Sequence, residues 1–137
     1  MNNCLFCKIA NKSVQSDIVY EDNDVIAFLD INPVNPGHTL VVPKAHHEQL
    51  LELPEDQILP TVQAVKKVMK ALMSLPDVEG VNIVQNNYSA AGQVVPHVHF
   101  HVIPRKVGDG HRHWPGIAYA EGEAALIATT LKDAITS

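Results

Sequence analysis

The chain has no surplus of basic residues. Its 137 residues include 10 Lys and Arg against 15 Asp and Glu, which gives a net charge of −5 and a pI near 5.8. Binding to a nucleic-acid backbone depends on clustered Lys and Arg, so this balance argues against nucleic acid as the main partner. A small phosphorylated ligand held in a local pocket is compatible with the composition.

The sequence also lacks an apolar run long enough to span a membrane. Its start, MNNCLFCKIA, has no basic segment of the kind that opens a secretory signal peptide. We therefore expect a cytoplasmic protein with no membrane partner. Repeats, linkers and low-complexity tracts are absent as well, so the length predicts one domain over residues 1–137 with a single core.

Cysteine is scarce, since only Cys4 and Cys7 occur in the chain. The gap of two residues between them is unsuited to most structural disulfides but suits a metal site or a redox pair. The neighbouring residues lack a thioredoxin-like pattern, which weakens the redox interpretation.

Apolar periodicity predicts the main elements. Residues 54–75 have the period of a helix, although Pro60 should kink this helix or move its start. One face of the helix carries apolar residues at three- and four-residue steps: Ile58, Val62, Val65, Met69 and Leu72. A final helix is expected over 121–135, and shorter helical turns are expected near residues 4–13 and 46–54.

Strands are expected in a hairpin over residues 17–30 and at 38–44, 80–86 and 97–105, where apolar runs end at turn residues. The hairpin connections favour an antiparallel sheet. Together these elements predict an α+β fold with about five antiparallel strands, a long central helix and a C-terminal helix.

The stretch HVHFHVIPR, residues 97–105, carries three histidines at every second position. Because side chains alternate along a strand, His97, His99 and His101 are predicted to share one face, with Val98 and Val102 on the other. Such a row could be a solvated face, a metal site, or a device for phosphoryl or nucleotidyl transfer. The small-residue loop before it, NNYSAAGQVV, lets backbone N–H groups approach an anion and favours the third interpretation.

These residues resemble the histidine triad superfamily, and in particular its bacterial Hint-type branch of nucleoside phosphoramidases. The resemblance spans nearly the whole chain. It includes CLFCKIA, VYEDNDVIAFLDINPVNPGHTLVVPKAH and NNYSAAGQVVPHVHFHVIPR, with the triad itself at 97–101. It implies a histidine triad fold and cleavage of purine nucleoside phosphates at the α-phosphorus through a covalent nucleotidyl-histidine.

By this resemblance each histidine has a separate role. His99 is the expected nucleophile, and His101 is expected to bond the α-phosphate and to assist proton transfer. His97 would orient its neighbours or serve as a metal ligand, and His38 would buttress the triad.

The resemblance also implies a nucleotide pocket. Leu5, Phe6, Ile9 and Phe28 are expected to wall the base, although simple core packing is an alternative for all four. Asp30 would hold the ribose hydroxyls, with Ile31 beside it, or else cap the following turn. Asn86 and Gln93 would contact the phosphate or the leaving group. Val94 stands where many members have Ser or Thr, so only its backbone N–H is available there.

A structural zinc site is the second expectation from the resemblance. Its ligands would be Cys4, Cys7, His46 and His97, a closed Cys₂His₂ set, with His47 as the neighbouring alternative to His46. The competing interpretation is a pair of buried thiols without metal.

Relatives of the Hint type are homodimers, so a homodimer is expected. Its isologous interface would use the central helix and a sheet edge, and Trp114 would approach the partner's site.

The sequence therefore predicts an enzyme that hydrolyses or transfers nucleotides from purine nucleoside phosphoramidates and needs no cofactor for catalysis. Two alternatives stay open at this point. One is a dinucleoside polyphosphate hydrolase, and the other is a nucleotide-binding protein with little turnover, which the absent hydroxyl at Val94 favours.

Overall fold

A computed structural model describes residues 3–136 of the chain. A five-stranded antiparallel sheet forms its centre, in the spatial order β1-β2-β3-β5-β4. The strands are β1 (Ile18–Glu21), β2 (Val25–Leu29), β3 (Thr39–Pro43), β4 (Gly80–Gln85) and β5 (Phe100–Arg105). The helices are α1 (Leu5–Ala10), α2 (Glu55–Met73) and α3 (Glu123–Thr136), with short 3₁₀ turns η1 (Leu50–Glu52) and η2 (Ser89–Ala91). The predicted α+β fold is confirmed.

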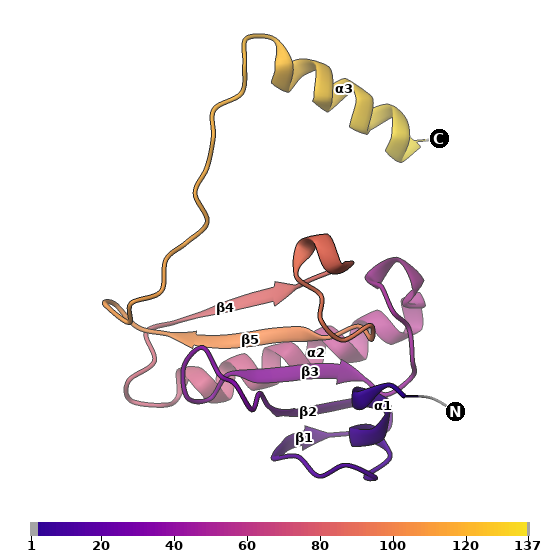
Figure 1. Cartoon of the computed structure of the whole chain (residues 1–137), viewed down its shortest axis with the longest axis vertical. Helices are drawn as coiled ribbons and strands as arrows, with labels where there is room; N and C mark the ends of the chain where they lie inside the picture. Colours follow the sequence, from indigo (N-terminus) through magenta and orange to yellow (C-terminus); the bar gives the residue numbers. More distant parts are fainter. Residues whose placement is uncertain (1–2, 137) are drawn as a thin grey trace.

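The sheet is covered on both faces in its middle (Figure 1). On one face α2 packs over Val25, Val41 and Val102, and on the other α1 packs over Ile26 and Val42. This explains why β2 and β3 read as continuous apolar runs, since every residue of β3 is buried. The second face, which α1 covers only in part, is the face that carries the histidines.

The buried face of α2 differs from the predicted one. Val65 and Leu72 are buried as expected, but Ile58, Val62 and Met69 are 40%, 42% and 36% exposed. Thr61, Ala64 and Val68 take their place against the sheet. The helix carries apolar residues on two adjacent stripes, and the stripe that contains the small residues Thr61 and Ala64 lies on the strands. Pro60 lies inside the helix, so the expectation that it delays the helix start was wrong.

The histidine strand is shorter than predicted. The ladder of β5 begins at Phe100, and His97–His99 precede it. Their direction is still fixed by hydrogen bonds, because Val98 N–H donates to the His47 carbonyl at 2.8 Å. Val98 and Val102 are fully buried, so the predicted alternation of side chains is preserved.

Loop 30–38 is held close to the sheet at Gly37, which has a φ of +103°. A Cβ at this position would lie 3.1 Å from Leu72 Cδ2 and 3.5 Å from Pro104 Cγ. Glycine is the residue that combines this backbone conformation with so close an approach. The next residue is His38, and its position therefore depends on this contact.

The chain beyond β5 leaves the body of the protein. Figure 1 shows an extended segment and α3 projecting away from the sheet. None of the described residues of α3 is buried, and Leu131 and Ile135 are 56% and 81% exposed. Within residues 3–136, the helices are too short or too polar to cross a bilayer.

Candidate active site and metal cluster

The imidazoles of His99 and His101 open into a cavity of about 390 Å³, here called the histidine cavity. It lies on the sheet face that α1 partly covers. Its lining consists of Leu5, Phe6, Ile9, Val14, Gln15, Ser16, Phe28, Leu29, Asp30, Ile31, Asn32, Leu40, Gly92, Val94, Val95, His99 and His101. A largely apolar slot thus ends at two imidazoles and one carboxylate.

The structure brings most of the sequence-predicted substrate residues to this cavity. Those that line it are Leu5, Phe6, Ile9, Phe28, Asp30, Ile31 and Val94. Phe6 and Phe28 meet edge to face, with ring centroids 5.5 Å apart, and the Phe6 ring also lies 4.9 Å from that of His99. These two phenylalanines therefore both pack in the core and line the cavity.

Two predicted residues lie elsewhere. Asn86 lines a different cavity, which shares His101 with the first. Gln93 is buried, and its side chain joins its own loop to the segment before η1. Its Oε1 accepts the Tyr88 N–H and its Nε2 donates to the Glu48 carbonyl, both at 2.8 Å. The structure thus gives Gln93 a role in shaping the loop, while a contact with substrate stays a prediction.

Sequence reasoning missed several residues of the cavity wall, namely Val14, Gln15, Ser16, Asn32 and Leu40. The segment of residues 11–17 carries no motif, and it reaches the cavity because the connection from α1 to β1 folds beside Ile31. The sequence of β3 does not single out Leu40, because every residue of this strand is buried. The structure shows that Leu40 pairs with His101 across the ladder and therefore shares its face.

Hydrogen bonding fixes the tautomer of His99. Its Nδ1 lies 2.7 Å from the carbonyl oxygen of His97, which can only accept, so Nδ1 carries the proton. The other nitrogen, Nε2, keeps its lone pair and has no hydrogen-bond partner in the described part of the chain. A neutral imidazole with a free Nε2 at a cavity wall is a nucleophile or a base.

A chain of three groups fixes the tautomer of His101. The Val34 N–H donates to His38 Nδ1 at 3.0 Å, so the proton of His38 resides on Nε2. His38 Nε2 lies 2.9 Å from His101 Nδ1 and donates to it, which places the His101 proton on Nε2. His101 thus presents an N–H donor beside the lone pair of His99, and the two rings are 5.0 Å apart.

Burial keeps these imidazoles neutral. Desolvation is the main cause that lowers the pKa values of His38, His97, His99 and His101. The pKa of His101 falls to about 4, because the nearby His99 and His38 add to the effect of burial and Asp30 only partly opposes it. Near neutral pH the row is therefore uncharged, and His99 keeps the lone pair on Nε2.

Asp30 connects the cavity to the loop after β2. Its Oδ1 accepts the Asn32 N–H at 2.8 Å, so it caps the following turn, as one of the two sequence interpretations proposed. Its Oδ2 lies 3.6 Å from His38 Nε2. The same carboxylate lines the cavity, where it is able to accept hydroxyl donors.

A second cluster of side chains lies behind the triad. The structure brings together the Sγ atoms of Cys4 and Cys7 and the Nδ1 atoms of His46 and His97. Their separations are 3.2 Å for Cys4–His97, 3.3 Å for Cys7–His46, 3.5 Å for Cys7–His97 and 3.1 Å for His46–His97. A tetrahedral zinc ion with ordinary bond lengths would separate two nitrogens by about 3.3 Å, and a nitrogen from a sulfur by about 3.5 Å. The cluster therefore fits such an ion, with His46 rather than His47 as the fourth ligand.

The protonation of the cluster also fits a metal. His97 Nε2 donates to the Pro43 carbonyl at 2.7 Å, which leaves Nδ1 without a proton and directed at the thiols. Burial, together with a hydrogen bond and the charge of Cys4, raises the pKa of the Cys7 thiol to about 11. The four ligand atoms face one point, and thiolates are stable there only when a cation is bound. Metal binding would therefore release the thiol protons.

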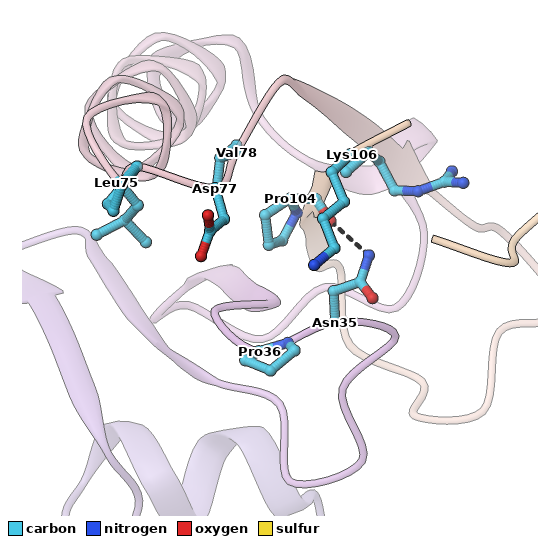
Figure 2. Close-up of a pocket in the computed structure, with 9 residues that line it drawn as sticks. Asn35, Pro36, Leu75, Asp77, Val78, Pro104 and Lys106 are labelled. Atoms are coloured by element: carbon cyan, nitrogen blue, oxygen red, sulfur yellow. Dashed lines mark hydrogen bonds between the residues drawn. The ribbon is translucent and has the colours of Figure 1, made fainter. Parts of the chain in front are cut away.

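A further cavity, of about 360 Å³, lies away from the histidines between the end of α2, loop 30–38 and the end of β5. Figure 2 shows its proline walls, the side chains of Asp77 and Lys106, and the hydrogen bond from Asn35 Nδ2 to the Pro104 carbonyl at 2.9 Å. Its lining contains neither histidine nor cysteine. The groups that could perform nucleophilic chemistry are therefore gathered at the histidine cavity.

Comparison with known proteins agrees with this arrangement. The sequence profile of the HIT domain matches residues 11–108. An uncharacterised HIT-like protein of Methanocaldococcus jannaschii is 54% identical over 107 residues, which cover 78% of this chain and 82% of that protein. An adenosine 5′-monophosphoramidase of Candida albicans is 41% identical over 107 residues, 75% of this chain and 70% of that protein.

Solved structures give the same result. A HIT family protein of Bacillus subtilis superposes with a TM-score of 0.88 at 37% identity, over 96% of both chains. A zinc-bound histidine triad family protein of Mycobacterium smegmatis superposes with a TM-score of 0.76 at 32% identity, over 96% of this chain and 97% of that one. The resemblance inferred from the residues is thereby confirmed, and this chain belongs to the HIT domain family.

Proposed function

We propose that the protein is a nucleotide hydrolase or nucleotidyl transferase that cleaves purine nucleoside phosphoramidates at the α-phosphorus. The observation that carries the proposal is the pair of tautomers at the end of the histidine cavity, where a His99 lone pair stands beside a His101 donor. The relatives named adenosine 5′-monophosphoramidase and the relative named adenylylsulfatase support this reaction class.

The reaction runs in two displacements. His99 Nε2 attacks the phosphorus, the new P–N bond forms as the bond to the leaving amine breaks, and the amine takes up a proton through His101. Water then attacks the phosphorus of the nucleotidyl-histidine, its proton passes back through His101, and Nε2 is released with the nucleoside monophosphate. The His97 carbonyl stabilises the positive charge that develops on the His99 ring, because it holds the Nδ1–H throughout.

The rest of the cavity binds the nucleoside. Phe6, Ile9 and Phe28 offer an apolar slot for a purine, and Asp30 accepts hydrogen bonds from the ribose hydroxyls. Gly92, with a φ of +92°, keeps the chain free of a side chain where it passes the cavity, and Val94 contributes its backbone N–H. The pocket needs no basic residue for this, since imidazole and backbone donors serve the phosphate.

We further propose that Cys4, Cys7, His46 and His97 hold a structural zinc ion. The support is the ligand geometry and the zinc-bound relative of known structure. A closed set of two thiolates and two imidazoles leaves no position for a substrate. The ion would fix α1 to the segment before β5, and the two ends of this link carry Phe6 and His99.

We also propose a homodimer. An isolated helix of the length of α3 is only marginally stable in water, and its apolar residues Ile127, Leu131 and Ile135 are 38%, 56% and 81% exposed. The outer stripe of α2 and Ile83 on the edge strand β4 are half exposed as well. A second copy that received the C-terminal arm of the first would bury these surfaces in an isologous interface, with Trp114 on that arm.

The nucleophile is tested by His99→Ala. The variant should lower kcat/KM for an adenosine phosphoramidate with a fluorescent amine by about 10⁴-fold, because the covalent path is lost. His47→Ala, which removes a nearby imidazole outside the cavity, is the matched control and should retain activity. Equal rates for His99→Ala and the wild type would refute the assignment, and nucleotide binding without turnover in either would favour a binding protein.

The pH dependence follows from the lowered pKa values. Protonation of His99 removes the attacking lone pair, and protonation of His101 removes the acceptor for His38. Both pKa values lie below the ordinary imidazole range, that of His101 at about 4, so activity is kept above them and lost as the pH falls through them. The acidic limb of kcat/KM should therefore lie clearly below pH ~6.5, the ordinary imidazole value. The hydrolysis of substrate without enzyme is subtracted, and a limb near 6.5 would contradict the neutral row.

The zinc site is tested by the adjacent pair His46→Ala and His47→Ala. Elemental analysis of the wild type should find about one zinc per chain. His46→Ala should lose most of it and His47→Ala should keep it, since only His46 places a ring nitrogen in the cluster. Loss of heat stability should accompany loss of metal. Equal zinc content in both variants would exclude the proposed fourth ligand.

The dimer is tested on α3 with Leu131→Lys and Asp133→Lys. Both place a lysine in the same turn, but Leu131 belongs to the apolar stripe and Asp133 lies on the opposite side of the helix. Burying a lysine charge in an apolar interface is costly, so Leu131→Lys should shift the mass measured by light scattering from dimer towards monomer. Asp133→Lys should leave it unchanged. A monomeric wild type would refute the proposal.

A further inference from the structure

A cavity of about 530 Å³ adjoins the histidine cavity on the other side of His101, and we call it the arm cavity. Its floor is the face of β4 and β5 turned away from α2, where Asn82 and Val84 pair with Ile103 and His101. Its wall is the beginning of the C-terminal arm, residues 111–114. Of the residues that the structure describes, His101 is the one that lines both cavities.

The arm cavity is rich in nitrogen donors. Its lining includes Arg105, Arg112, His111 and His113 together with Asn82 and Asn86, and it contains no Asp or Glu. This is unusual in a chain whose 15 acidic residues outnumber its 10 basic ones. The charge of Arg105 is already matched by Asp109, at 2.6 Å, and Asp30 approaches His38 from the histidine cavity. Arg112 makes no ion pair within residues 3–136, so its charge is available to a ligand.

The residue before Arg112, His111, is held to the body of the protein by hydrogen bonds. Asp109, with a side chain only 3% exposed, accepts hydrogen bonds from Arg105, Asn35 Nδ2 and the His111 N–H. His111 Nε2 donates to the Val34 carbonyl at 3.1 Å, and its own carbonyl accepts from Arg105 Nη2 at 2.9 Å. The arm is thus tied to the body up to the residue before Arg112.

The two cavities meet at His101. The apolar histidine cavity suits the base and ribose, and a group displaced in line departs from the side of the phosphorus opposite His99 Nε2. We propose that the arm cavity is the leaving-group subsite and that it selects leaving groups that carry a negative charge of their own, with Arg112 as the specificity-determining residue. The inference rests on the proposed cleavage at the α-phosphorus. Carboxylate, phosphate and sulfate share the required chemistry.

A matched pair of substrates isolates this charge. The adenosine 5′-phosphoramidates of tryptophan and tryptamine differ by one carboxylate, and both are followed by release of AMP. The wild type should cleave the tryptophan compound with a kcat/KM about 2- to 5-fold higher, as expected for an exposed ion pair. Arg112→Gln should bring this ratio towards one, and so should high salt, which screens an exposed pair.

Lys70→Gln is the matched control, because it removes one positive charge from the exposed side of α2, on the opposite face of the sheet and away from the stripe of Val62 and Met69. It should leave the ratio as in the wild type. A wild-type ratio of one or less would overturn the proposal, and so would a ratio that Arg112→Gln does not change. Diadenosine tetraphosphate and adenosine 5′-phosphosulfate identify the anion, since the compound most impaired by Arg112→Gln carries the preferred leaving group.

Failure of the proposed function gives a different result. If no compound is cleaved, the dissociation constants of the same pair are measured on the wild type and on Arg112→Gln. Tighter binding of the tryptophan compound that disappears in the variant would support the anion subsite and refute the cleavage. Equal binding of the pair would refute the subsite.

Discussion

The buried residue His97 is the point on which the site depends. Its four polar groups are all used: Nε2–H on the Pro43 carbonyl, Nδ1 in the Cys-His cluster, the backbone carbonyl on His99 Nδ1, and the backbone N–H on the Val95 carbonyl. An imidazole that is fully buried must satisfy each of these groups, because an unpaired one would cost about 1–3 kcal/mol. The same residue therefore sets the tautomer of the next histidine and joins the cluster of thiols to the cavity.

The histidines of the row differ in chemistry because each ring has a different hydrogen-bond partner on the side away from the cavity. His99 is backed by a carbonyl and exposes a lone pair, whereas His101 is backed by the His38 N–H and exposes a proton. Under the proposed function, three chemically identical side chains would thus serve as a metal ligand, a nucleophile and a proton donor. Desolvation is the largest cause for all three, lowers each pKa and keeps the rings neutral, so hydrogen bonding decides which nitrogen of each ring carries the proton.

Much of this could be predicted from the sequence where a local rule applies. Alternation placed His97, His99 and His101 on one side of Val98 and Val102, and the resemblance to the histidine triad superfamily brought Cys4, Cys7 and His46 to the same place. These local rules failed where the buried side of an element depends on the surface of the same chain against which it packs. The helix α2 carries two apolar stripes, and only the shape of the sheet decides which one is buried. The segment 11–17 carries no motif, and it reaches the cavity because of the path of the chain. The residues of the arm cavity are far apart in sequence, and no periodicity relates Asn82 to Arg112.

Gly37 shows that the geometry of the site also depends on a residue that has no reactive group. It has no side chain and takes no part in any step, yet its hydrogen atom occupies the space between Leu72 and Pro104 that brings loop 30–38 down onto the sheet. A larger residue would strain the backbone at this φ and press on the end of the Leu72 side chain, directly before the histidine whose N–H sets the proton of His101. A search for important positions that considers only reactive side chains would pass over position 37.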